Sequence, residues 1–182
     1  VIEAVEAGRE IDKVFVANTL QGDLARELMS VLKANKILLQ KVPIEKINRL
    51  TRRNHQGVVA MLSAVSYARL DTVVPSLFEE GRVPLIVLLD GITDVRNFGA
   101  IARTCECAGV DAIVIPRRGG VSVGADAMKT SAGALSYLPV CREGSTVNSV
   151  KYLLDCGFRI IAATEKGSVD YTEADYTQPT AI

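Results

Sequence analysis

The sequence predicts an α/β protein built on a parallel sheet, and three stretches in the middle of the chain carry this prediction. Residues 85–89 are an unbroken apolar run that ends in an Asp-Gly pair, which is typical of a strand buried on both faces. Apolar side chains then recur at helical spacing over 98–108, and a second apolar run follows at 112–115. Because ligands of such sheets bind beyond the carboxyl ends of the strands, the polar loop 90–97 is the first place to look for chemistry.

The first third of the chain predicts a small three-layer domain. Amphipathic stretches at helical spacing separate short apolar runs in a β-α-β-α-β order. The expected elements are the end of a helix at 1–8, strands at 14–17, 37–42 and 58–65, and helices at 23–34 and from Pro43 on.

Further elements flank the central strands. Asn97 is expected to cap the helix that follows it. The other expected elements are a short helix at 73–79, a helix of small residues at 126–135, a strand at 138–141, a helix at 146–156, a strand at 159–164 and the start of a strand at 180–182. We therefore expect an N-terminal domain at 1–66, a linker at 67–83 and a second domain at 84–182.

The composition is that of an ordinary globular protein. Of the 182 residues, 48% are hydrophobic and 23% charged, and no apolar run approaches transmembrane length. Nothing resembles a signal peptide, so a cytoplasmic location without a membrane partner is expected.

The charges are unevenly distributed although the formal net charge is zero. Residues 33–53 carry seven basic side chains against Glu45 alone, a net charge of +6. This block is the most suitable surface for phosphate groups, and a merely solvated face is the alternative interpretation.

Two common chemistries are disfavoured by the sequence. Cys105 and Cys107 lie about 200° apart around a helix axis, so they cannot jointly bind a metal. We expect the four cysteines to be buried free thiols and no metal to be bound. No GxGxxG pattern follows any predicted strand, so the dinucleotide-binding fingerprint is absent.

Three motifs together resemble a known family. They are Asp94-Val-Arg-Asn-Phe-Gly-Ala-Ile-Ala-Arg103 with Ala-Gly-Val-Asp at 108–111, Lys129-Thr-Ser-Ala-Gly-Ala-Leu135, and Asn54-His-Gln-Gly57. They are similar to motifs of the SpoU (TrmH-type) RNA ribose 2′-O-methyltransferases of the SPOUT superfamily. The third motif is similar to members with an N-terminal domain like ribosomal protein L30e, especially bacterial 23S rRNA guanosine 2′-O-methyltransferases.

The resemblance implies a fold and an activity. It implies an L30e-like RNA-binding domain followed by a parallel-sheet SPOUT domain with a trefoil knot, and S-adenosylmethionine as methyl donor. Arg103 matches the arginine credited with activating the ribose hydroxyl, and Asn97 matches its motif partner. A guanidinium does not readily lose a proton, so Arg103 is better suited to hold a phosphate and stabilise alkoxide charge. An ion pair with Glu106 is its alternative role.

Further site residues are expected at strand ends and turns. Thr164 and Glu165 follow a predicted strand where the family's methyl donor lies near the rim of its site. His55 is the only histidine; a turn histidine is usually structural, and a functional one would contact an RNA base or sugar. The candidate RNA-binding residues are Arg52, Arg53, His55, Arg96, Arg117, Arg118 and Lys129.

The resemblance also implies that the family's second and third motifs lie beyond Ile182. A chain ending there is expected to lack the knot segment, to bind the methyl donor weakly or not at all, and to be inactive as a fragment. Full-length members are expected to form homodimers.

Other functions stay open at this point. The first motif does not distinguish rRNA from tRNA targets. A non-catalytic RNA-binding protein with a degenerate methyltransferase domain is a second class. A nucleotide-binding oxidoreductase is a third, and the missing glycine fingerprint counts against it.

Overall fold

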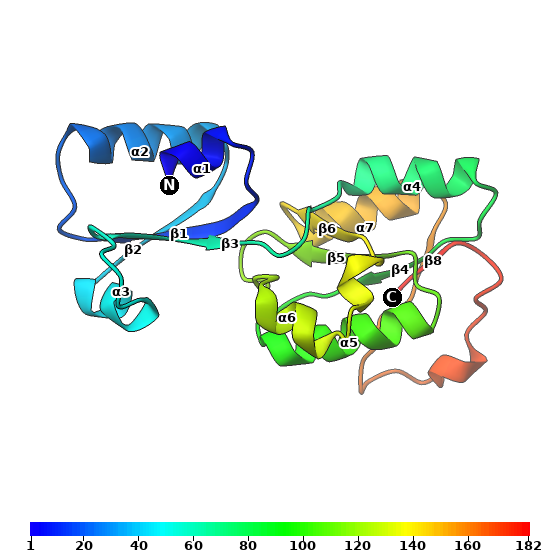
Figure 1. Cartoon of the computed structure of the whole chain (residues 1–182). Helices are drawn as coiled ribbons and strands as arrows, with labels where there is room; N and C mark the ends of the chain where they lie inside the picture. The colour runs from blue at the N-terminus through cyan, green and yellow to red at the C-terminus, as the bar shows by residue number, and fades with distance from the viewer. The chain divides into compact units, whose positions relative to one another are not determined.

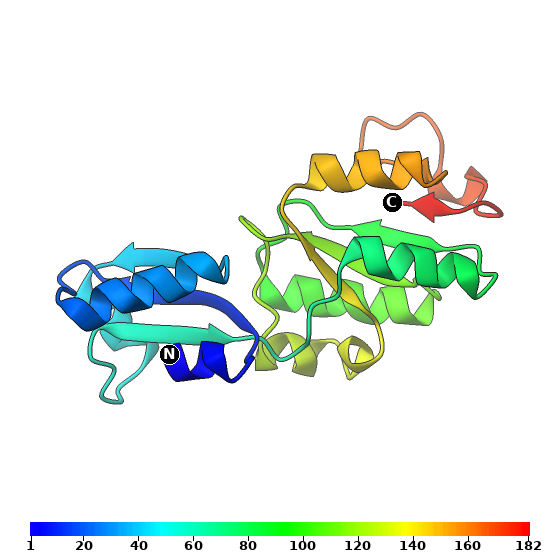
Figure 2. The ribbon, with the colours of Figure 1, turned by 90° about the horizontal axis from the view of Figure 1, so that it is seen from above.

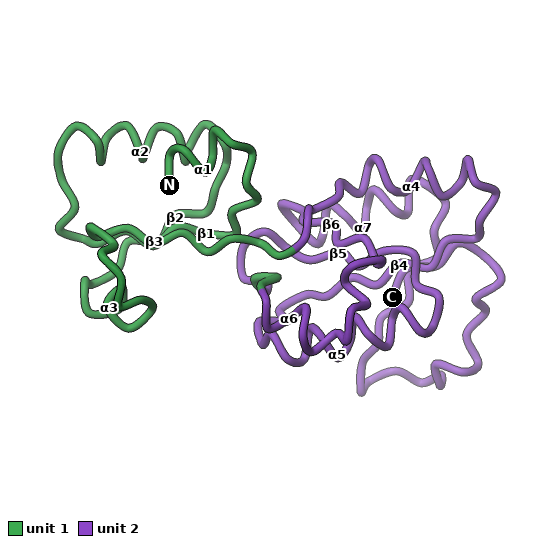
Figure 3. Tube along the Cα trace, in the orientation of Figure 1, with its two compact units in different colours: residues 1–64, 122–124 green, residues 65–121, 125–182 purple.

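The computed structural model describes all residues from 1 to 182. The chain forms two compact units (Figure 3). Unit 1 comprises residues 1–64 and 122–124, and unit 2 comprises residues 65–121 and 125–182. The short segment 122–124 belongs to unit 1, where the backbone N–H of Ala64 donates to the carbonyl oxygen of Val123 at 2.7 Å.

Unit 1 is a three-stranded sheet with helices on both faces (Figure 1). The sheet order is β2-β1-β3, in which β1 pairs parallel with β2 and antiparallel with β3. Its elements are α1 (Ile2–Glu6), β1 (Ile11–Ala17), α2 (Asp23–Ala34), β2 (Leu38–Val42), α3 (Ile44–Leu50) and β3 (Val58–Leu62). The predicted three-layer arrangement is confirmed, and the helix at 23–34 has the predicted bounds.

Alternation along β1 builds the two cores of unit 1. Val14 and Val16 pack with Leu28 and Leu32 of α2, while Phe15 and Ala17 pack on the other face with Ile47 of α3. Successive strand side chains point to opposite faces, so one strand supplies both layers.

Unit 2 is a five-stranded sheet whose pairings are all parallel. Its order is β6-β5-β4-β8-β7, and the crossover helices cover both faces (Figure 2). Its elements are α4 (Leu70–Glu79), β4 (Leu85–Leu88), α5 (Val95–Cys107), β5 (Ala112–Pro116), α6 (Ala125–Thr130), the 3₁₀ turn η1 (Ala134–Ser136), β6 (Val140–Glu143), α7 (Thr146–Asp155), β7 (Arg159–Ile160), the 3₁₀ turn η2 (Tyr171–Glu173) and β8 (Thr180–Ala181).

The predicted linker 67–83 is part of the body of unit 2. It contains α4, which buries Leu70, Val74 and Leu77. Leu70 and Val74 pack in one core cluster with Ile86 of β4. A connection that buries leucine and valine in this way is not a free linker, because its apolar face needs the sheet beneath it.

The predicted helix 126–135 is wrong beyond Thr130. α6 ends at Thr130, and η1 begins only at Ala134. Between them Ala132 has φ 51° and Gly133 φ 92°, left-handed values that end an α-helix. The expected strands at 138–141 and 159–164 are also shifted or shortened, to β6 and β7.

None of the helices is long and apolar enough to cross a membrane. The four cysteines are free thiols as predicted, but only Cys105 and Cys141 are buried, whereas Cys107 is exposed and Cys156 half-buried.

Candidate functional site

The carboxyl ends of the unit 2 strands meet at one edge of the sheet because all five strands are parallel. The polar loop 89–94 follows β4 there, and residues 117–121 follow β5. Thr146 at the start of α7 donates to Oδ1 of Asp90 at 3.0 Å, so the segments after β4 and β6 are tied together. The edge expected to carry the chemistry is therefore a set of polar loops.

The helix after β4 is capped by Asp94, and the predicted cap at Asn97 is wrong. Oδ1 of Asp94 accepts a hydrogen bond from the backbone N–H of Asn97 at 2.8 Å, and α5 begins at Val95. Both residue types cap helices well, but Asn97 already lies in the first turn. Its side chain is exposed and is not used to start the helix.

Arg103 lies on the exposed surface of α5, eight residues after the helix begins. Its guanidinium makes no ion pair, and the alternative pairing with Glu106 is not formed. Glu106 instead accepts a weak hydrogen bond from the thiol of Cys107. At about 1.5 Å per residue, Arg103 is about 12 Å along the helix from Val95. The Cα–Cβ bond of a helical residue tilts toward the helix N-terminus, and the N-terminus of α5 follows the carboxyl end of β4.

Arg96 and Arg103 share one face of α5. They are seven residues apart, which places them about 20° from each other around the helix axis. Both side chains are exposed. Arginine side chains are common ligands of phosphate oxygens, so this face of α5 suits a nucleic acid backbone.

Gly99 connects this basic face to α6. A Cβ on Gly99 would lie 1.9 Å from Oγ1 of Thr130, so α5 and α6 pack closely at this glycine. Lys129 immediately precedes Thr130 and is exposed. The first and middle sequence motifs are thus brought together by the fold, with their basic side chains in solvent. We call Arg96, Arg103 and Lys129 the α5–α6 basic face.

Arg117 and Arg118 follow the carboxyl end of β5, as predicted. The backbone N–H of Arg117 donates to the carbonyl of Glu143 at 2.7 Å, so the backbone there extends the sheet. Arg118 is exposed. A Cβ on Gly120 would lie 2.4 Å from the carbonyl oxygen of Pro116, which shows that this turn folds back tightly on the strand.

Thr164 and Glu165 form an exposed turn after β7. Oγ1 of Thr164 accepts from the backbone N–H of Lys166 at 3.3 Å, and its carbonyl accepts from Gly167 at 3.1 Å. The Glu165 carboxylate is in solvent beside the threonine hydroxyl. This turn lies beyond the end of β7 at Ile160, and a hydroxyl and a carboxylate there suit a ligand with ribose hydroxyls.

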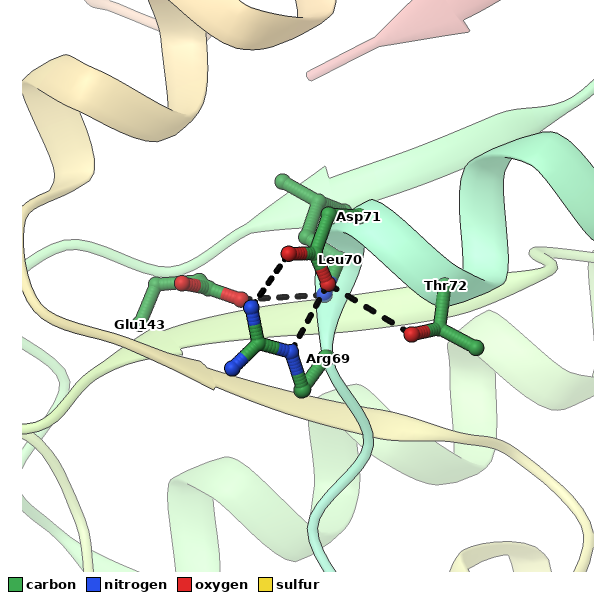
Figure 4. Close-up of polar contacts among 5 residues, drawn as sticks. All are labelled: Arg69, Leu70, Asp71, Thr72 and Glu143. Carbon is green, nitrogen blue, oxygen red and sulfur yellow. Dashed lines mark hydrogen bonds and ion pairs between the residues drawn. The ribbon is translucent and has the colours of Figure 1, made fainter.

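One acidic site at the same edge was missed by sequence reasoning. Oε1 of Glu143, at the end of β6, accepts a hydrogen bond from the backbone N–H of Leu70 at 2.9 Å (Figure 4). This bond supplies a partner for a backbone N–H at the start of α4, which has none within the helix. Arg69 hydrogen-bonds Asp71 and holds the pKa of that carboxyl below its usual range. Asp71 and Glu143 both line the adjoining cavity of about 510 Å³. Because two carboxylates repel an anion, this cavity does not suit phosphate. Seventy-three residues separate the two partners, and no local pattern announces the contact.

His55 of unit 1 has the structural role that turn histidines usually have. Its Nδ1 accepts from the backbone N–H of Gly57 at 3.0 Å, and its Nε2 lies 2.8 Å from Oδ1 of Asn48 on α3. With Nδ1 as acceptor, Nε2 carries the proton and donates to Asn48. Both ring nitrogens are therefore used within the protein, and only the ring faces are left for a ligand.

The basic block of unit 1 centres on α3. Lys46 and Arg49 are exposed on this helix, and Arg52 and Arg53 are exposed just after it. Lys46 also lies over the Phe15 ring, 5.5 Å from its centroid. The α3 side of unit 1 therefore carries a concentration of cations.

The fold and these surfaces define a class: a two-unit α/β protein with basic surfaces and polar loops at the carboxyl edge of a parallel sheet. Residues 84–182 match the SpoU rRNA Methylase family. Residues 1–68 match the family described as RNA 2′-O ribose methyltransferase substrate binding. The chain belongs to the SpoU rRNA methylase family, as the sequence motifs predicted.

Relatives support the assignment over nearly the whole chain. A protein of Staphylococcus saprophyticus named as a TrmH family tRNA/rRNA methyltransferase is 34% identical over 180 residues, which is 99% of this chain and 72% of that protein. A Bacillus subtilis protein with the same family name, YacO, is 31% identical over 183 residues, covering 100% of this chain and 73% of its own length.

Two solved structures share the fold. An AdoMet-bound rRNA methyltransferase from Sinorhizobium meliloti is 24% identical with a TM-score of 0.55, over 99% of this chain and 65% of that one. The SpoU methyltransferase AviRb from Streptomyces viridochromogenes, in complex with AdoMet, is 22% identical with a TM-score of 0.55, over 98% and 66%. The chain thus spans about two thirds of the length of these structures.

Proposed function

We propose that this chain is part of an S-adenosylmethionine-dependent methyltransferase that modifies a ribose 2′-hydroxyl of RNA, with a guanosine of 23S rRNA as the target. Family membership supports methyl transfer to RNA. The single observation that carries the proposal is the α5–α6 basic face, where Arg103 of the first motif is exposed and makes no ion pair. An unpaired guanidinium at this place is free to bind a phosphate of the substrate.

The residues present suit the methyl donor in part. The exposed hydroxyl of Thr164 and carboxylate of Glu165 would hold ribose hydroxyls of S-adenosylmethionine at the end of β7. The donor, when bound, supplies an electrophilic methyl group on a positively charged sulfur. The chain's own residues would orient the RNA beside it.

Arg103 acts in this proposal as a positioning and charge-stabilising group. A guanidinium stays protonated in proteins, so it does not remove the proton of the 2′-hydroxyl. It binds the phosphate next to the target ribose through two parallel hydrogen bonds and stabilises negative charge that develops on the attacking oxygen. Arg96 and Lys129 bind neighbouring phosphates, and Asn97 offers an exposed amide at the start of the same helix.

Unit 1 supplies the second RNA surface in this proposal. Its match to a substrate-binding family and the cations around α3 support RNA contact through Arg52 and Arg53. Arg117 and Arg118 add phosphate contacts beyond β5. We expect the whole enzyme to act in the cytoplasm as a homodimer, with no metal in its reaction.

A tRNA target is the second candidate, because the relatives carry the name tRNA/rRNA methyltransferase. A single experiment tests both targets. A chain of the relatives' full length is incubated with tritiated S-adenosylmethionine and either 23S rRNA fragments or tRNA transcripts, and the product is digested to locate 2′-O-methylguanosine. Methyl transfer to 23S rRNA alone supports the proposal. Methyl transfer to tRNA alone contradicts the proposed 23S rRNA target and makes tRNA the substrate.

The same assay tests Arg103. Arg103→Ala is expected to lower methyl transfer about 100-fold or more, the scale of losing a group that stabilises transition-state charge. Lys151→Ala, an exposed cation on α7, is the matched control and should retain activity. Near-normal transfer by Arg103→Ala would remove this residue from the mechanism, and no transfer by the unaltered protein to any RNA would favour a non-catalytic RNA-binding protein.

A further inference from the structure

One face of the unit 1 sheet is covered by its helix only in part. α1 and α2 pack on the opposite face, whereas α3 lies under one end of the strands (Figure 1). α3 has only seven residues, and the core cluster beneath it contains Phe15 of β1 but no earlier residue of that strand. The strand positions before Phe15 on this face therefore lie outside the cluster. The first residues of the chain, in α1, take no part in this area because they pack on the other side.

The strand register places three side chains on the uncovered part. Lys13 pairs with Leu38 of β2 and with Met61 of β3. Directly paired residues share a face of the sheet, and so do residues two apart along a strand, so this row lies beside Phe15 on the α3 face. Met61 is 38% exposed, and Lys13 and Leu38 are half-buried. We call Lys13, Leu38 and Met61 the open strip; it offers apolar surface next to a cation.

Two ammonium groups lie together at the border of the open strip. Nζ of Lys13 is 5.6 Å from the centroid of the Phe15 ring, and Nζ of Lys46 on α3 is 5.5 Å from the same centroid. The separation of the two charges cannot exceed the sum of these distances. Both lysine side chains therefore extend over the face that carries Phe15, one from the strand and one from the helix.

Neither ammonium group is paired with a carboxylate. The ring of Phe15 attracts both cations but does not neutralise them, and the two like charges repel each other. An anion that binds beside them relieves this repulsion, so the pair favours a negatively charged ligand. The alternative interpretation is that the two lysines only cover the ring, in which case their charges have no further role.

The charges and the open strip together suit a strand of RNA. Ammonium groups bind phosphate oxygens, and an accessible methionine adapts its shape to different bases and sugars. We propose that a single strand of the substrate RNA binds across the open strip, with its phosphates at Lys13 and Lys46. This inference rests on the proposed function, because it assumes that unit 1 binds RNA. It adds Lys13, which lies outside the basic block 33–53, and it places RNA on the sheet itself.

The three methionines of the chain report on three different surfaces. Met61 lies in the open strip, Met29 packs on the opposite face of unit 1, and Met128 lies on α6 of unit 2. The chain 1–182 is isotope-labelled at the methionine methyl groups and titrated with a single-stranded RNA of about ten nucleotides, followed by NMR. The Met61 signal should shift, and the Met29 signal should stay in place.

Lys13→Met and Lys46→Met test the two charges. Methionine removes the charge but keeps an unbranched side chain over Phe15, and urea unfolding checks that the variants stay folded. Each variant should bind the RNA about fivefold more weakly at about 0.1 M salt, which corresponds to a slope of log affinity against log salt that is shallower by about 0.7 for one lost phosphate contact.

Two controls accompany these variants. Lys33→Met makes the same change at an exposed lysine of α2, on the opposite face, and should retain the affinity of the unaltered chain. Lys13→Arg combined with Lys46→Arg keeps both charges and should also retain it. Fluorescence anisotropy measures the affinity of every protein for the same RNA.

The outcomes distinguish this inference from the proposed function. Full affinity in the variant that carries both Lys13→Met and Lys46→Met would overturn the inference, and the lysines would then only cover Phe15. A shift at Met128 without one at Met61 would also overturn it and would leave RNA binding by unit 2 intact. A chain that binds no RNA would overturn it as well, whereas methyl transfer by a chain of the relatives' full length tests the proposed function separately.

Discussion

Gly99 and Thr130 approach so closely that a Cβ on Gly99 would lie 1.9 Å from the threonine hydroxyl oxygen. The same Cβ would lie 2.7 Å from the threonine Cβ and 3.0 Å from the backbone nitrogen of Ser131. The hydroxyl is held in place because it donates to the carbonyl of Asp126 at 2.8 Å. This contact joins the first and middle motifs and sets Lys129 beside the helix that carries Arg103.

Gly99→Ala should therefore destabilise unit 2. The inserted methyl group overlaps both a side chain and the backbone, and overpacking of this kind costs about 1–3 kcal/mol or more. Urea unfolding followed by circular dichroism measures the loss. Gly144→Ala is the matched control, because a Cβ there meets nothing within 4 Å, and it should be near neutral. Equal stability of the two variants would show that α6 moves freely relative to α5.

Substitution of Asp94 should destabilise the protein more than substitution of Asn97. Asp94→Ala removes the side chain that accepts from the backbone N–H of Asn97, and loss of such a cap costs about 1 kcal/mol. Asn97→Ala removes an exposed amide that does not start the helix, so the free energy of unfolding should change by less than about 0.5 kcal/mol. Chemical denaturation of both variants checks the order. A larger loss for Asn97→Ala would restore it as the cap.

The cysteines give a prediction about pH. Burial, with the nearby carboxylates of Glu143 and Asp71, raises the pKa of the Cys141 thiol to about 12 from an ordinary value of 9.0. Between these values the unfolded state loses the proton while the folded state keeps it, so the folded state binds more protons. This contribution to stability is complete below about pH 9 and is lost as the pH rises toward about 12.

Urea unfolding at pH 8 and pH 10.5 measures this dependence. The unaltered chain should lose more stability over that interval than Cys141→Ala. Burial also raises the pKa of Tyr152 to about 12, and the resulting loss of stability should be the same in both proteins. Alkylation of the native protein at pH 8 gives a second readout. Cys107 is exposed and should react first, while Cys141 should be protected until the protein unfolds. Rapid modification of native Cys141 would contradict its burial.

Much of the fold could be predicted because its signals are local. The helix at 23–34 has one apolar stripe, and the strands at 85–88 and 112–116 are apolar runs, so periodicity alone locates them. The break after Thr130 could not be predicted from composition, because small residues are compatible with a helix and only the left-handed values at Ala132 and Gly133 end it. The choice of Asp94 over Asn97 as cap is similarly decided by one hydrogen bond.

The sequence motifs propose the residues of the candidate site, whereas the positions of those residues come only from the structure. The motifs single out Arg103 as a candidate. Its distance from the start of α5 depends on which residue caps the helix. α5 begins at Val95, earlier than a cap at Asn97 would allow. The link from Glu143 to Leu70 spans 73 residues and depends on the sheet order. Side-chain patterns report on the faces of single elements, whereas contacts between elements arise only when the sheet is assembled.

The α5–α6 basic face should determine how RNA binding by this chain depends on salt. Each phosphate neutralised by a cation releases counterions, so on a single strand the slope of log affinity against log salt becomes shallower by about 0.7 for each phosphate that a variant no longer neutralises. Arg96→Ala with Arg103→Ala removes two exposed guanidinium groups and should reduce the slope by about 1.4. Arg26→Ala removes a cation that is already paired with Asp23 in unit 1, so its slope should stay close to that of the unaltered chain. Anisotropy titrations of a single-stranded RNA between about 50 and 200 mM salt measure all three proteins. An unchanged slope in the double variant would mean that phosphates do not reach α5, and Arg103 would then be left without the substrate interaction on which its proposed role depends.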